Sequence, residues 1–253
     1  MIDTHCHLYT KEFDEDIEAV MTRALDEGIT RFYLPAIDAG CTKRMNTLED
    51  KFPGHCFSMV GLHPCSVKEN VEEELQHLKD LLNQRKFIGV GETGLDFFWD
   101  KTFIKEQYYA LETQIELALQ YNLPLILHTR KATQQTIDVI AKYKDTDLKG
   151  IFHCFGGSLA EAKQIIDLNF SLGIGGVLTY KNAGIAEVLE HVDMRYIVLE
   201  TDAPYLAPVP MRGKRNESSY LKYVVEKLAF IKKISVEEAK EITSRNAEKI
   251  FGV

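Results

Sequence analysis

The chain begins MIDTHCHLYT, in which His5 and His7 stand two residues apart. Alternate residues of an extended strand point to the same side, so a strand here would aim both imidazoles at one point. Imidazole nitrogens and carboxylate oxygens are the ligands that divalent zinc, manganese and cobalt take in proteins. We therefore predict that His5 and His7 are the first two ligands of a metal site.

Other histidines and carboxylates stand at the ends of later apolar runs. One such histidine alone is more simply a core or surface imidazole, but five of the eight histidines share this position. Glu92 has two oxygens that can bridge a pair of ions, and Asp202 can bind an ion and also accept a proton. A lone structural zinc would instead take four ligands rich in cysteine. The full set of predicted residues is His5, His7, His63, Glu92, His128, His153 and Asp202.

Apolar runs bounded by turns predict eight strands. They are residues 1–7, 31–36, 56–62, 87–92, 125–128, 151–154, 170–174 and 196–199. Between them lie patterns with one apolar helical face, including residues 14–27 and 106–121. Near the C-terminus, Ser235 and Glu238 predict a capping box at the start of a further helix.

The alternation of strands and helices predicts the α/β class with parallel strands, and within it a (β/α)8 TIM barrel. The alternative is an open doubly wound sheet, but the GxGxxG turn typical of that fold is missing after the first strand. No Ser/Gly-rich linker or charge block divides the sequence, so we expect residues 1–253 to form a single barrel domain. The C-terminal strand ends of a barrel share one face, which would bring the predicted residues together.

The composition is that of an ordinary globular protein, with 45% hydrophobic and 27% charged residues. Five scattered cysteines without a CxxC pair favour reduced thiols, and no export signal opens the chain, so we expect a cytoplasmic location. No apolar run approaches the ~20 residues of a membrane span. The net charge of −8 argues against non-specific coating of nucleic acid but allows a local basic site. Nothing in the sequence indicates an obligate protein partner.

Several residues near the predicted site allow two interpretations. The stretch MRGKRN, residues 211–216, is either a solvated loop or a phosphate clamp. The aromatic residues 97–99 either stack on bases or cap the barrel. The clamp would contain Arg212, Lys214 and Arg215, with Arg130 and Lys131 adding to it.

Three further residues adjoin the predicted ligands. Cys6 and Cys154 have the opposite parity along their strands, which favours buried packing residues over metal thiolates. Glu200 shares the parity of Asp202. It is either a hydrogen-bonding partner behind the ligands or part of a structural ion pair inside the barrel.

Taken in order, seven motifs resemble the TatD-like metal-dependent deoxyribonucleases, a branch of the amidohydrolase superfamily. They are DTHCHL, GLHP, GETGLDFFWD, LPLILHTR, FHCFGGS, TYKNA and LETDAPYLAP with RGKRN behind it. Each motif is weak alone, but the ordered set is specific and runs from residue 2 to at least residue 220.

The resemblance implies a (β/α)8 barrel that holds two divalent metal ions, Zn²⁺, Mg²⁺ or Mn²⁺. One ion would be held by His5, His7, Glu92 and Asp202, and the second by Glu92, His128 and His153. The catalytic residues would be Asp202, Glu92 and His63. Substrate would be bound by His63, Arg130, Tyr205, Arg212 and Lys214.

The activity that the resemblance implies is metal-dependent hydrolysis of DNA, often from the 3′ end, with nucleic acid bound locally near that end. Two rival activities use the same ligands: deacylation of D-aminoacyl-tRNA, and hydrolysis of another small ester or amide. A catalytically silent binding protein is a further alternative. Such a protein would usually have lost a ligand, whereas every ligand of the set is present here.

Overall fold

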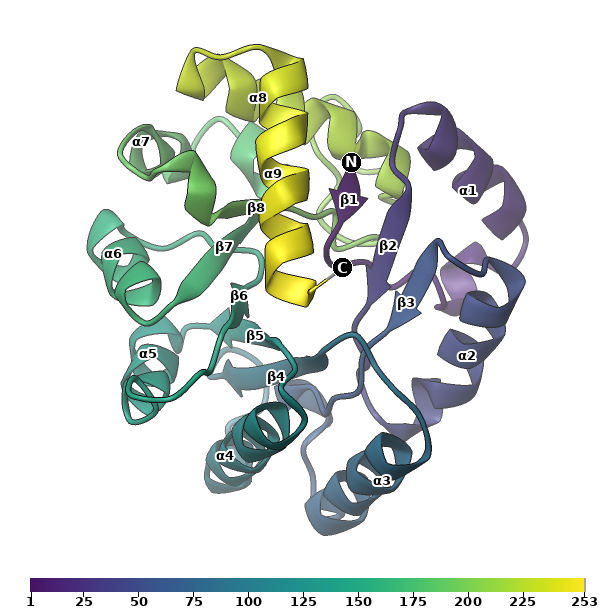
Figure 1. The fold of residues 1–253 in the computed structure, drawn as a ribbon, viewed down its shortest axis with the longest axis vertical. Coiled ribbons are helices and arrows are strands. Elements are labelled where there is room, and N and C mark those ends of the chain that lie inside the picture. The colour runs from purple at the N-terminus through teal and green to yellow at the C-terminus, as the bar shows by residue number, and fades with distance from the viewer. Residues whose placement is uncertain (253) are drawn as a thin grey trace.

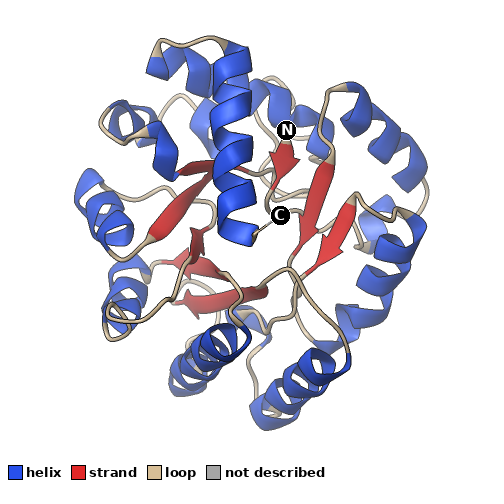
Figure 2. Cartoon of the chain, viewed as in Figure 1, coloured by secondary structure: helices blue, strands red, loops and turns tan. Residues whose placement is uncertain are grey.

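The computed structural model describes residues 1–252. An inner ring of parallel strands is surrounded by helices (Figure 1, Figure 2). The strands are β1 (Ile2–Asp3), β2 (Arg31–Leu34), β3 (Cys56–Ser58), β4 (Val90–Asp96), β5 (Leu125–Arg130), β6 (Gly150–Phe152), β7 (Phe170–Ile174) and β8 (Ile197–Leu199). This arrangement confirms the predicted α/β class and the (β/α)8 barrel.

Hydrogen bonds close the ring of strands. The strands pair in two runs, β1–β2–β3 and β4–β5–β6–β7–β8. Between the runs, Val60 forms a parallel bridge to Val90. On the other side, the Thr4 N–H donates to the carbonyl of Leu199 at 3.0 Å. First and last strands are thereby joined, so one wall carries every ligand candidate.

The helices cover the outside of the ring (Figure 2). They are α1 (Ile17–Asp26), α2 (Thr42–Lys51), α3 (Val71–Gln84), α4 (Ile104–Tyr121), α5 (Thr133–Ala141), α6 (Leu159–Asp167), α7 (Ile185–Glu190), α8 (Leu221–Lys232) and α9 (Val236–Phe251). Short 3₁₀ turns are η1 (Lys11–Phe13), η2 (Ala39–Cys41), η3 (Pro64–Ser66), η4 (Gly176–Thr179), η5 (Met194–Tyr196) and η6 (Ser218–Tyr220). The Ser235 side chain caps α9 by accepting from the Glu238 N–H at 3.1 Å, which confirms the predicted helix start. The reciprocal bond of the predicted capping box, from the Ser235 N–H to the Glu238 side chain, is not formed among the described residues. Within residues 1–252, no helix has both the length and the apolar character needed to cross a membrane.

The end of the barrel where the strands begin is filled with apolar side chains. α9 crosses this end, and the last turn of α9 lies near its centre (Figure 1). Phe251 of α9 packs on Tyr33 with ring centroids 4.2 Å apart. The cluster consists of Ile2, Tyr33, Met59, Ile126, Ile151, Val198, Ala247 and Phe251. A water-excluded plug leaves only the opposite mouth of the barrel open to substrate.

Several predicted strands have wrong boundaries; among them is β6, which ends at Phe152, so that His153 follows the strand instead of lying in it. β1 ends at Asp3 rather than at residue 7, β3 ends at Ser58 rather than at residue 62, and β4 runs from Val90 to Asp96 rather than over residues 87–92. The segment after β1 still lies in the barrel wall, because the Cys6 N–H donates to the Tyr33 carbonyl at 3.1 Å. His5 and His7 therefore follow the strand instead of ending it.

Candidate active site

The open mouth of the barrel leads into a cavity of about 700 Å³. Its volume lies in the range of small-molecule and nucleotide pockets. The strand ends place most of the predicted residues around it, as the barrel geometry requires. The lining includes His7, His63, Glu92, His128, Arg130, His153, Asp202 and Tyr205. His5 lies beneath the lining and is fully buried.

Glu92 lies at the centre of the histidines, inside an irregular part of β4. The register of β4 against β5 shifts between Val90 and Thr93. Gly91 has φ 158°, and a Cβ there would lie 2.6 Å from the Cβ of Ile126. Only glycine allows so close an approach of the two strands. The irregularity presents the Glu92 side chain to the cavity instead of continuing the regular alternation.

One oxygen of Glu92 faces a first group of side chains, which we name the β1/β8 group: His5, His7 and Asp202. Glu92 Oε2 lies 3.1 Å from His5 Nε2 and 3.4 Å from His7 Nε2. Asp202 Oδ1 lies 3.7 Å and 3.5 Å from the same two nitrogens. His5, His7 and Glu92 have donor atoms within 4.8 Å of one another, and so do His5, His153 and Asp202, so His5 belongs to two possible sets of metal ligands.

The other oxygen of Glu92 faces a second group, the β5/β6 group: His128 and His153. Glu92 Oε1 lies 2.9 Å from His128 Nδ1 and 3.0 Å from His153 Nε2. One carboxylate thus presents each of its oxygens to a separate set of imidazoles. A carboxylate placed in this way could be shared between two cations if both groups held one.

In His7 and His128, the hydrogen bond of the nitrogen that points away from Glu92 shows which ring nitrogen carries the proton. The Tyr9 hydroxyl donates to the Pro35 carbonyl at 2.7 Å, so at 2.8 Å it must accept from His7 Nδ1. His128 Nε2 donates in the same way to Asp96 Oδ2 at 3.0 Å. In the neutral rings the free lone pairs are therefore His7 Nε2 and His128 Nδ1, and both point at Glu92.

His63 differs from these two imidazoles because it turns its N–H, rather than its lone pair, toward the cavity. Its Nδ1 accepts from the Cys65 N–H at 3.0 Å, so the proton of the neutral ring is on Nε2. Nε2 lies 3.3 Å from Glu92 Oε1 and faces the cavity as a donor. Nitrogen and oxygen atoms of His63, Glu92 and His128 come within 4.8 Å of one another. His63 nevertheless lacks the lone pair that a ligand needs, and it is better placed to donate to a substrate oxygen.

The charges of the cluster are strongly coupled. Burial disfavours the ionised form of Glu92, but the imidazoles of His153, His63 and His5 outweigh it and hold the Glu92 pKa well below its usual value. Burial lowers the pKa of His7, and hydrogen bonds to Asp202 and Glu92 raise it to about 9. The buried carboxylates thus favour positive charge on the neighbouring imidazoles. A divalent cation would supply this charge, since the same lone pairs bind metal once deprotonated.

Sequence reasoning missed Asp96, which orients His128. The reason is the strand boundary: with β4 ending at residue 92, Asp96 belonged to a loop. β4 in fact reaches Asp96, where the side chain is 1% exposed and sits at a strand end of the catalytic face. A carboxylate four residues after Glu92 in GETGLD was the available signal.

Glu200 and the two cysteines have different outcomes. Glu200 is fully buried, and its Oε1 lies 3.4 Å from His153 Nδ1, so it stands behind His153 rather than behind Asp202. Cys6 is fully buried in the core, as predicted. The prediction that Cys154 is a buried packing residue is wrong, because its partly exposed side chain lines the cavity.

The predicted basic clamp is only partly assembled. Arg215 turns away from the cavity and donates to both oxygens of Asp16, at 2.8 and 2.7 Å, so its predicted role in a clamp is wrong. Arg212 lies over the Tyr180 ring at 4.0 Å. Neither Arg212 nor Lys214 is among the residues that line the cavity. Arg130 and Tyr205 do line it.

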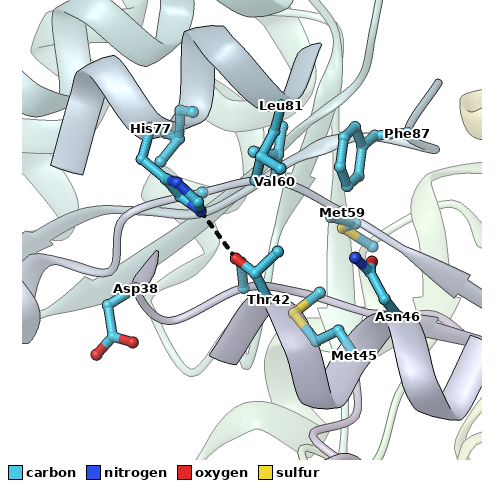
Figure 3. A pocket seen from close by; sticks show the side chains of 12 residues that line it. Asp38, Thr42, Met45, Asn46, Met59, Val60, His77, Leu81 and Phe87 are labelled. Carbon is cyan, nitrogen blue, oxygen red and sulfur yellow. Dashed lines mark hydrogen bonds between the residues drawn. The ribbon is translucent and has the colours of Figure 1, made fainter. Parts of the chain in front are cut away.

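A second cavity lies between α2, α3 and the segment after β3 and shares no lining residue with the first. Its volume is about 10 Å³, room for one water at most. Figure 3 shows His77 and Thr42 facing each other across it, with Nε2 and Oγ1 3.0 Å apart. It is a packing void and has no room for a substrate.

The sequence matches the family described as TatD related DNase over residues 2–252. The chain belongs to this family. The uncharacterized metal-dependent hydrolase YabD of Bacillus subtilis is 36% identical and covers 100% of this chain and 99% of its own. The 3'-5' ssDNA/RNA exonuclease TatD of Pantoea ananatis is 30% identical, with 100% of both chains covered. The crystal structure of YjjV, a TatD homologue from Escherichia coli, superposes with a TM-score of 0.94 at 29% identity, covering 100% of this chain and 98% of that one.

Membership of the TatD family makes the protein a metal-dependent hydrolase on a TIM barrel of the amidohydrolase type. The side chains at its open mouth agree with that assignment. Imidazole and carboxylate donors converge there, and their groupings within 4.8 Å include His5, His7 and Glu92.

Proposed function

We propose that this protein is a two-metal phosphodiesterase that removes nucleotides from the 3′ end of single-stranded DNA. The observation that carries the proposal is the position of Glu92, whose two oxygens face separate groups of imidazoles at 2.9–3.4 Å. Relatives in the family are named as exonucleases acting on single-stranded DNA and RNA. A site with two adjacent cations suits a phosphodiester, because the attacking and leaving oxygens both carry charge.

The residues that would hold the ions divide along the Glu92 carboxylate. One ion fits the β1/β8 group with Glu92, and the other fits the β5/β6 group with Glu92. Zinc, magnesium or manganese bound there would lower the pKa of water and neutralise a phosphate.

The side chains supply the proton transfers and the orientation. Asp202 lines the cavity beside His7, where its carboxylate can take the proton of the attacking water. His63 presents its Nε2–H to the same cavity and can donate to a non-bridging oxygen or to the leaving 3′ oxygen. Arg130 at the rim offers donors to the adjacent phosphate.

The test is release of nucleotides from 3′-labelled single-stranded DNA by chelated protein with Mg²⁺, Mn²⁺ or Zn²⁺ added back. Wild type should release label with at least one ion, and Asp202→Asn should release none while it unfolds at an unchanged temperature. Asp147→Asn is a matched control, because this exposed residue lies outside the cavity. No release by wild-type protein that binds two ions would refute the proposal and direct attention to esters and amides.

A further inference from the structure

The turn after β4 holds two large aromatic side chains out of the core. Phe98 is 45% exposed and Trp99 is 66% exposed. Their neighbour Phe97 packs against the core, so it alone serves the capping role that the sequence left open for residues 97–99. Large aromatic rings exposed together beside a cavity often mark a binding site, because exposing them to water is unfavourable unless a ligand covers them. Trp99 lines the catalytic cavity.

Arg130 joins the two rings to the site. Its guanidinium carbon lies 4.0 Å from the Phe98 ring centroid and 5.0 Å from that of Trp99. The register of β5 against β4, which pairs Arg130 with Asp96, fixes this approach. Within residues 1–252 the guanidinium takes part in no ion pair, so its N–H groups stay free for a ligand. The stacked cation also keeps the rings in place.

Asp96 ties this turn to the metal ligands. Its Oδ1 accepts from the N–H groups of Phe98 and Trp99 at 2.8 and 3.0 Å. Its Oδ2 accepts from His128 Nε2 at 3.0 Å. The Asp96 N–H in turn donates to Gln107 of α4 at 2.9 Å. One buried carboxylate therefore sets both the aromatic turn and an imidazole of the β5/β6 group at a fixed separation.

We propose that Phe98, Trp99 and Arg130 form a platform on which a nucleobase next to the reacting phosphate stacks. The aromatic rings would offer a face to any base, and the free guanidinium donors would meet its phosphate. Because an unpaired end can turn its base out of the stack while bases within a duplex are stacked on both faces, the platform favours single-stranded ends. This inference rests on the proposed nuclease function and adds the substrate contact that selects an unpaired end.

The first test uses Trp99 itself, which is the only tryptophan of the chain. In Asp202→Asn protein, which should not cleave DNA, titration with a short oligothymidylate should quench its fluorescence in a saturable manner. An abasic sugar–phosphate oligomer of equal length and a blunt duplex should quench little. Equal quenching by the abasic oligomer, or none by oligothymidylate, would overturn the platform.

The second test is kinetic. Phe98→Ala and Trp99→Ala should each raise KM for oligothymidylate roughly tenfold with kcat nearly unchanged, as expected for a lost stacking contact. Phe230→Ala is the matched control, since Phe230 on α8 is 78% exposed and also carries a cation, Lys227, 5.4 Å from its ring. Unchanged KM in both platform variants, or an equal rise in the control, would refute the inference.

The two proposals fail separately. Fluorescence quenching by single strands without DNA hydrolysis under any ion would refute the nuclease function and support base stacking. Metal-dependent hydrolysis with no base-dependent quenching would support the nuclease function and refute the platform.

Discussion

The two groups of ligands on either side of Glu92 differ in what stands behind them. In the β1/β8 group, His7 is held by the neutral hydroxyl of Tyr9, and the His5 and His7 side chains are 0% and 4% exposed. In the β5/β6 group, His128 is held by the charged carboxylate of Asp96 and its side chain is 16% exposed. The first group is deep and its one outer hydrogen bond goes to a neutral hydroxyl, since His5 Nδ1 has no hydrogen-bond partner within residues 1–252. His128 instead borders the cavity and is supported by a carboxylate.

This difference assigns unequal tasks to the two groups. A carboxylate behind an imidazole makes that imidazole a more basic and better oriented ligand. At the solvent-facing position, where water competes, such support is needed most. It also connects His128 to the aromatic turn through Asp96. The β5/β6 group is therefore linked through one carboxylate to the turn that lines the cavity.

Replacing Glu92, which faces both groups, should affect both groups at once. Glu92→Gln would leave one oxygen and one NH₂ group where two oxygens had faced imidazoles, so at most one ion would keep an oxygen ligand from this residue. We expect the rate to fall by at least about 1,000-fold and the bound metal to drop from two ions to one or fewer. Metal content after gel filtration and kcat measure this. Glu112→Gln, at an exposed pair with Lys142, is the control, and a Glu92 variant with two ions and full rate would contradict the assignment.

Removing the charge behind His128 should affect mainly the β5/β6 group. Two N–H groups bind Oδ1 of Asp96, so the oxygen of an asparagine would stay there and its NH₂ would face His128. That donor forces the proton of His128 onto Nδ1 and removes the lone pair aimed at Glu92. Asp96→Asn should therefore lower the affinity for one of the two ions by about 100-fold.

Metal titration of Asp96→Asn separates the two groups. One binding event should stay at wild-type affinity and the other should weaken. Asp100→Asn serves as the control, because Asp100 lies in the same turn and, among residues 1–252, its side chain bonds to Lys68 and to the Thr102 backbone but to no histidine. Equal weakening of both ions would show that the two groups are not independent.

Much of this architecture could be predicted from sequence, because it depends on composition at many positions. Eight apolar runs gave the barrel, and β7 at Phe170–Ile174 matches its predicted range. The spacing of His5 and His7 predicted that the rings converge, and their Nε2 atoms lie 3.2 Å apart. This convergence survived an incorrect strand boundary, since the segment stays hydrogen-bonded in the wall.

What could not be predicted depends on single contacts across the barrel. The role of Asp96 required the true end of β4, which is set by pairing with β5 rather than by local apolar character. The orientation of Arg215 is set by Asp16, a residue about 200 positions away in sequence. Ion pairs of this kind leave no local pattern in the chain, so a basic stretch alone does not identify a phosphate clamp.

The β1/β8 group should release a proton when it binds metal. The pKa of His7 is raised to about 9, so this imidazole is protonated at pH 7 and a cation must displace the proton. Metal affinity of this group should therefore rise about tenfold per pH unit up to pH ~9 and then level off. Calorimetry in buffers of different ionisation enthalpy counts the released protons. An affinity independent of pH between 6 and 8 would contradict this.

The smallest expected effect comes from the neutral partner of His7. Tyr9→Phe removes the acceptor of the Nδ1 proton and leaves the Pro35 carbonyl without its donor. We expect metal affinity of the β1/β8 group to fall by no more than about tenfold, and unfolding free energy by about 1 kcal/mol. Tyr33→Phe is a close control, since its buried hydroxyl at the plugged end has no hydrogen-bond partner within residues 1–252. Tyr33→Phe should keep the wild-type metal affinity and unfolding free energy. If Tyr9→Phe lost as much metal affinity as Asp96→Asn, the distinction between neutral and charged hydrogen-bonding partners would be wrong.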